Sequence, residues 1–116
     1  MSQITIKLED FLLPEETSLV GRENGESVLK KLKDKNLDFE RLEKDYEKII
    51  IDIPTNIVSI NKSFFLGLFE IPVQRLGRDG YFAKYQFNTT EHIQNKIKNH
   101  VDAALLKASQ GDILNA

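Results

Sequence analysis

The sequence contains no cysteine, and it has no excess of basic residues. The absence of cysteine excludes disulfides, thiolate metal sites and cysteine catalysis, and it is consistent with a reducing compartment. Acidic and basic residues nearly balance, 18 against 16, which gives a net charge of −2. Because a strongly basic face is lacking, we do not expect nucleic acid as the main partner.

Long apolar runs are also missing from the chain. The longest, residues 64–69, is far shorter than the roughly 20 residues that span a bilayer. The first residues, MSQITIKLEDF, lack the apolar core that follows a basic start in a signal peptide. We therefore expect a cytoplasmic protein that does not enter a membrane. The 116 residues correspond to one domain, 1–116, with a frayed tail at 109–116.

The most apolar part of the chain is expected to form its centre. Residues 49–53 place four isoleucines around Asp52, and a strand that is apolar on both faces belongs in the middle of a sheet covered on both sides. A loop follows at 54–62. Asn61 or Ser63 then caps a helix, and this helix is predicted to continue to residue 76.

A proline and a glycine are expected to shape that helix and its end. Pro72 predicts either a kink or a restart of the helix. Gly77 suits the left-handed position after a helix end. A turn is predicted at 78–80, and the alternating sequence YFAKYQF at 81–87 predicts an aromatic strand.

The flanking segments complete the order of elements. Residues 4–8 alternate in the period of a half-buried strand, and 17–20 are expected to pair back on it as a short second strand. The residues GRENG at 21–25 predict a turn before the first helix, and Asp38 predicts the start of a second helical piece. Apolar residues at every fourth position from Ile93 predict a final amphipathic helix.

This order predicts an α/β fold. Strands that alternate with helices imply right-handed crossovers between at least three parallel strands, and the first hairpin adds an antiparallel edge. The result is a mixed sheet of about four to five strands with helices packed against it.

Three stretches resemble the STAS-like domains, relatives of the bacterial anti-sigma factor antagonists. They are Gly21-Arg22 with Gly25-Glu26-Ser27, the strand at 49–53 with Asp52, and Ser59-Ile60-Asn61-Lys62-Ser63-Phe64-Phe65-Leu66 opening a helix that runs to Arg75-Leu76-Gly77. Together with the order of elements, the resemblance covers most of the chain. It implies a STAS-like fold and a non-catalytic regulatory domain whose partner is a histidine-kinase-like ATPase or kinase.

The resemblance also implies a site. In the antagonists, a serine at this helix start is phosphorylated within an Asp-Ser-Ser-Gly run. Here the run is Asn61-Lys62-Ser63-Phe64, so that only Ser63 keeps the phosphate-bearing position. Partner binding is expected at Asn61, Lys62, Ser63 and Arg22.

Each of these residues also has a simpler interpretation. Phosphate at Ser63 would add a charge of about −1.5 to −2 and change the docking surface, whereas an unmodified serine there is an ordinary helix cap. The guanidinium of Arg22 suits a phosphate or a partner carboxylate, or it is an exposed turn arginine.

An alternative function is a small-molecule or nucleotide-binding module. Ligands of α/β proteins often bind at the carboxyl ends of the strands, where Asp52 and Asn56, with Arg22, would form the site. The simpler interpretation is that Asp52 orders the loop that follows it, since a buried acid needs partners.

No motif predicts a metal, a cofactor or catalysis. His92 and His100 are eight residues apart, unlike the i, i+4 pair that binds zinc, and we expect both on the surface. No phosphate-binding glycine loop is present. The aromatic residues are expected to form the core rather than a platform for single strands. A third possibility is a homodimer formed through an edge strand at 81–87.

Overall fold

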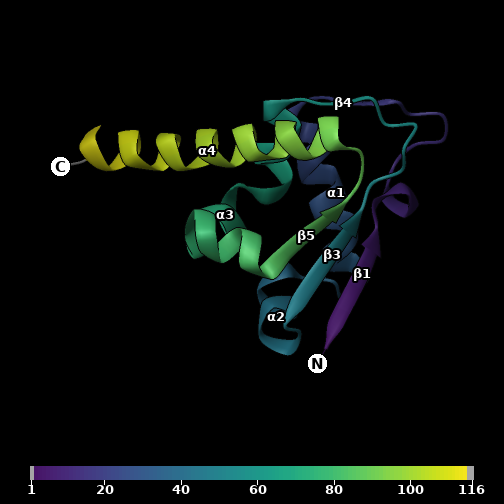
Figure 1. The fold of residues 1–116 in the computed structure, drawn as a ribbon, viewed down its shortest axis with the longest axis horizontal. Helices are drawn as coiled ribbons and strands as arrows, with labels where there is room; N and C mark the ends of the chain where they lie inside the picture. Colours follow the sequence, from purple (N-terminus) through teal and green to yellow (C-terminus); the bar gives the residue numbers. More distant parts are fainter. Residues whose placement is uncertain (1, 115–116) are drawn as a thin grey trace.

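The computed structural model describes residues 2–114, and the side chains of 2–106. Figure 1 shows an α/β fold. The elements are β1 (Gln3–Lys7), the 3-10 helix η1 (Leu8–Phe11), β2 (Ser18–Leu19), α1 (Arg22–Asp34), α2 (Phe39–Asp45), β3 (Lys48–Asp52), β4 (Ser59–Ile60), α3 (Lys62–Lys84), β5 (Tyr85–Asn88) and α4 (Glu91–Leu114).

The strands form two separate parallel sheets rather than one mixed sheet. The larger has the order β1-β3-β5, and the smaller pairs β2 with β4. The prediction of an α/β fold with β3 in the middle is confirmed. The predicted antiparallel hairpin is wrong: residues 18–19 pair in parallel with residues 59–60, and not with the first strand. Pairing of such short strands depends on the distant segment, which the local sequence does not reveal.

Within residues 2–114, the larger sheet is covered on one face only. Its strands lie side by side in the order in which they occur in the chain. Right-handed crossovers therefore put every connecting helix on the same side of the sheet. In β3, Ile49 and Ile51 are buried on that side, while Ile50 between them is only half-buried. Figure 1 shows the three strands in front of α1. The predicted coverage of both faces is therefore wrong.

Helix α3 bends at a glycine and not at its proline. Pro72 lies inside the helix, whereas Gly77 has φ 75° and ψ 173° and separates two helical segments. The prediction of a positive φ at Gly77 is confirmed. The predicted turn at 78–80 is wrong, because the chain resumes a helix there. Tyr81 is consequently helical, and the strand predicted from residue 81 begins only at Tyr85.

Helices α1 and α3 touch at two glycines. A β-carbon on Gly25 would lie 2.2 Å from the carbonyl oxygen of Phe64, and one on Gly67 would lie 2.3 Å from that of Arg22. The turn predicted at 21–25 is thus wrong, since α1 already begins at Arg22 and Gly21, with φ 94°, is its N-cap. This close contact brings the starts of α1 and α3 together.

Aromatic residues belong to the core, as predicted. Phe65, Phe69, Tyr81 and Tyr85 are all buried, and the rings of Tyr81 and Tyr85 stack with centroids 4.5 Å apart.

Within the described residues, no helix has the length and apolar character required to cross a bilayer.

Candidate functional site

Two helices begin side by side at the end of the small sheet. In that sheet Ser18 pairs with Ser59, and Leu19 pairs with Ile60. Each strand leads into a helix within three residues, β2 into α1 and β4 into α3. Because the two strands are parallel, the amino-terminal ends of both helices lie at the same place.

Asn61 joins these two helix starts. Its side-chain oxygen accepts hydrogen bonds from the backbone N–H groups of Phe64 at 2.9 Å and Gly21 at 3.3 Å. The first bond caps α3, and the second reaches the N-cap residue of α1. Of the two caps that the sequence predicts, Asn61 is the one that forms. Its backbone N–H also donates to Leu19 across the small sheet at 2.9 Å.

Ser63 and Lys62 are exposed in the first turn of α3. Ser63 is not the cap, so its hydroxyl is not engaged in closing the helix. The surface around it carries the positive ends of two helix dipoles, which favour a nearby anion. An exposed hydroxyl at a place where two helices start side by side is thus well placed for contact with a partner.

Arg22 lies at the first position of α1, next to this surface. Its guanidinium donates to the carboxylate of Glu70 in α3 at 2.9 Å. The arginine side chain is 40% exposed and that of Glu70 is 16% exposed. The pair joins α1 to α3 close to the glycine contact, so that Arg22 has a structural partner within the chain as well as an accessible face.

His100 supports the same surface from α4. Its Nε2 atom lies 2.8 Å from the carbonyl oxygen of Ile60, the residue before Asn61, and its ring lies against Phe65. Partial burial lowers the pKa of His100; the bond to Ile60 opposes this effect, and Lys96 and Lys62 add to it. Although we predicted a surface histidine, His100 is half-buried. The signal was present, because residue 100 follows Ile97 by three positions on the apolar face.

Two exposed valines lie at the ends of the small sheet, Val20 beside the helix starts and Val58 at the opposite end. Val20, which precedes the N-cap of α1, is 49% exposed, and Val58, which precedes β4, is 62% exposed. The N–H of Val58 donates to Thr17 of the neighbouring segment at 2.8 Å. Neither valine could be identified from the sequence, since single apolar residues in loops carry no periodic signal.

Of the three residues of the alternative ligand site, Asp52 and Asn56 line neighbouring cavities that share Glu9 and Pro54, whereas Arg22 lies against Glu70 of α3. Asp52 accepts a hydrogen bond from the side chain of Asn88 at 3.0 Å and lines a small cavity of about 80 Å³. Asn56 lines a different cavity, of about 340 Å³, beside Glu9 and Asp10. Arg22 pairs with Glu70 in α3.

Among the described residues, no group of histidine, aspartate and glutamate side chains is arranged to hold a metal ion. No family model matches the chain, and neither a curated protein nor a solved structure was found to be similar to it. The resemblance to STAS-like domains therefore depends on the sequence stretches and the order of elements.

Proposed function

We propose that the chain is a cytoplasmic, non-catalytic regulatory domain of the STAS-like type that docks a partner protein at the paired starts of α1 and α3. The observation that carries this proposal is the double hydrogen bond of Asn61, which joins the two helix starts into one surface with Ser63 exposed on it. Val20, which precedes the N-cap of α1, adds apolar contact area beside the polar centre. The resemblance supports a histidine-kinase-like ATPase or kinase as the partner.

Phosphorylation of Ser63 is the control that we propose for this docking. A phosphate would add about −1.5 to −2 charge at a position where two helix dipoles and Lys62 stabilise an anion. The fold would remain unchanged because the Ser63 side chain is exposed and does not cap α3. The partner would then distinguish the two forms by electrostatics at the contact surface.

The docking surface is tested with Ser63→Arg, which places a large side chain at its centre. We expect a pull-down from the native host to lose the partner, and the affinity for the recovered partner to fall at least tenfold. Ser27→Arg is the matched control, because Ser27 of α1 is an exposed serine like Ser63 of α3. If both variants retain the partner with equal affinity, the partner does not dock at this surface.

The switch is tested separately with Ser63→Glu and Ser63→Ala. We expect Ser63→Glu to change the affinity for the recovered partner and Ser63→Ala to resemble the wild type. Ser27→Glu controls for the added charge alone. Equal affinities for all four proteins would exclude charge-dependent control at Ser63 and leave the docking surface itself unaffected.

A further inference from the structure

The far edge of the larger sheet carries backbone groups that no neighbouring strand uses among the described residues. Within the described part of the chain, β5 pairs only with β3. The carbonyl oxygen of Asn88 accepts from Ile53, at 3.0 Å, and so lies on the β3 side. Adjacent residues of a strand direct their backbone groups to opposite sides, so Tyr85 and Phe87 direct theirs away from β3. The side chain of Gln94 confirms this direction for Phe87, because it donates to the Phe87 carbonyl from the other side.

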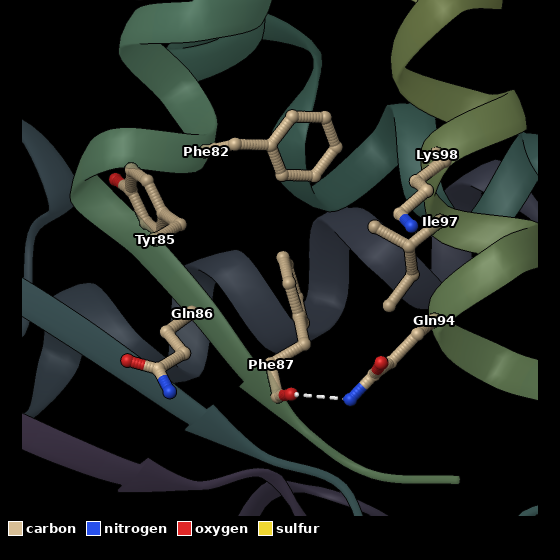
Figure 2. Close-up of a pocket in the computed structure, with 7 residues that line it drawn as sticks. All are labelled: Phe82, Tyr85, Gln86, Phe87, Gln94, Ile97 and Lys98. Carbon is tan, nitrogen blue, oxygen red and sulfur yellow. Dashed lines mark hydrogen bonds between the residues drawn. The ribbon is translucent and has the colours of Figure 1, made fainter. Parts of the chain in front are cut away.

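This edge lies in a groove. The groove has a volume of about 310 Å³ and is lined by Phe82 of α3, by Tyr85, Gln86 and Phe87 of β5, and by Gln94, Ile97 and Lys98 of α4. Figure 2 shows the rings of Phe82 and Phe87 and the side chains of Ile97 and Gln94 arranged around the space between β5 and α4. Tyr85 contributes its ring, since its hydroxyl donates to Glu43. Clefts of roughly 300 Å³ and above with apolar walls are typical binding sites.

Gln94 occupies the place of an additional strand. Its side-chain amide donates to the carbonyl oxygens of Phe87 at 3.2 Å and Thr89 at 3.4 Å. The Phe87 oxygen is an acceptor that the main chain of a neighbouring strand would use. Because Gln94 is an exposed residue, an entering strand displaces its amide without unpacking the core.

We propose that this groove, the β5 groove, binds an extended segment of a partner protein, which adds to β5 as a fourth parallel strand. The partner residue opposite Gln86 donates its N–H to the Tyr85 carbonyl and accepts from the Phe87 N–H, as a parallel ladder requires. Strand addition of this kind derives affinity from main-chain bonds and specificity from pockets for alternate side chains. The groove and the docking surface share α3 but lie at opposite ends of it, because Phe82 is near its end and Ser63 is in its first turn.

The groove also predicts the sequence of its occupant. In the bound segment, one residue lies opposite Gln86. The side chains of the residues before and after it lie on the same face as Phe87, where they contact Phe82 and Ile97 and must be apolar. Lys98 is the one charged residue among those that line the groove. The occupant is therefore expected to alternate apolar with polar residues and to carry a carboxylate that reaches Lys98.

A partner segment fits better than a second copy of this chain. The free edge of β5 lies between Phe82 at the end of α3 and Gln94, Ile97 and Lys98 of α4. In a symmetric dimer, two such recessed edges would have to approach each other, and the flanking helices of the two copies would meet first. A single extended segment enters the groove without this conflict.

The experiment selects displayed random octapeptides against the full chain and measures their binding to variants. We expect enriched peptides with alternating apolar residues and an acidic residue, and we expect bound peptide to shift the amide resonances of residues 85–87. Gln94→Trp fills the groove and should lower affinity at least tenfold, whereas Gln94→Ala removes the competing amide and should raise it. Asn95→Trp is the matched control, an exposed position on the same helix that does not line the groove.

Two further variants test the role of Lys98 and the independence of the groove from the docking surface. Lys98→Glu, also at an exposed position, should weaken peptides that carry the carboxylate, and Ser63→Arg should leave peptide binding unchanged. The proposal is overturned if no octapeptide is enriched, or if Gln94→Trp binds as Asn95→Trp does. It is also overturned if light scattering shows a dimer of the wild type that Gln94→Trp abolishes, because a second copy would then be the occupant.

Discussion

At the residue scale, Asn61 and His100 hold the docking surface from two sides. Asn61 joins the starts of α1 and α3 through its side chain, and His100 bonds to the preceding residue, Ile60, from α4. Three helices therefore depend on a short segment around residues 60 and 61. Changes in the charge of His100 are expected to reach this surface directly.

The burial of His100 predicts a dependence of stability on pH. Its pKa in the folded chain is lowered from 6.5, so that the unfolded chain takes up a proton at a higher pH than the folded chain does. The free energy of unfolding should therefore decrease as the pH falls from about 7 toward 5. Urea denaturation at a series of pH values measures this slope.

Substitution identifies the residue responsible for this slope. His100→Gln retains a side-chain N–H for the Ile60 carbonyl but does not titrate, so that the decrease between pH 7 and 5 should become smaller. His92→Gln is the control, because His92 is an exposed residue of the same helix. If the profile of His100→Gln coincides with that of the wild type, other groups cause the pH dependence.

At the element scale, the break in α3 depends on a single backbone conformation. Gly77 has φ 75° and ψ 173°, a region that is essentially restricted to glycine and that costs other residues about 1–3 kcal/mol. A β-carbon at this position would have no atom within 4 Å, so the cost is conformational and not steric. Gly77→Ala should therefore lower the free energy of unfolding by about 1–3 kcal/mol, measured by chemical denaturation.

Gly80 provides the matched control three residues later. It lies in the helical segment after the break, where a β-carbon would contact the Leu76 side chain at 3.4 Å. Gly80→Ala should be neutral or stabilising by up to about 1 kcal/mol, because alanine is the better helix former. Equal destabilisation by both substitutions would show that packing rather than backbone conformation determines the cost at Gly77.

The elements that could be predicted from the sequence are those with local signals. Such signals come from residues that are close together in the sequence. Examples are the isoleucines of β3, the cap at Asn61 and the apolar stripe that begins at Ile93. Tyr81 was misassigned because Tyr81 and Tyr85 are spaced for one helix face as well as for one strand face, and sequence alone does not separate these periods. Gly25 indicated a turn, while its role in the helix contact depends on Phe64, which is far away in the sequence.

At the scale of the whole molecule, the strand order explains why the sheet has an open face. The order β1-β3-β5 and right-handed crossovers together leave one face without helices in the part of the chain that the structure describes. The residues in register across the middle of that face are Thr5, Ile50 and Gln86. The run of isoleucines predicted a strand buried on both sides. This prediction was wrong because the order of the strands, which decides where the helices lie, cannot be read from the sequence.

Substitutions in β3 measure this difference between the two faces. Ile51 is 1% exposed on the covered face, so Ile51→Ala should lower the free energy of unfolding by about 2–5 kcal/mol. Ile50 is half-buried between Thr5 and Gln86, and Ile50→Ala should cost about 1 kcal/mol, since less apolar surface returns to water. Urea denaturation compares the two directly. Losses of equal size, measured at a protein concentration where light scattering detects a dimer, would mean that a second copy covers the open face.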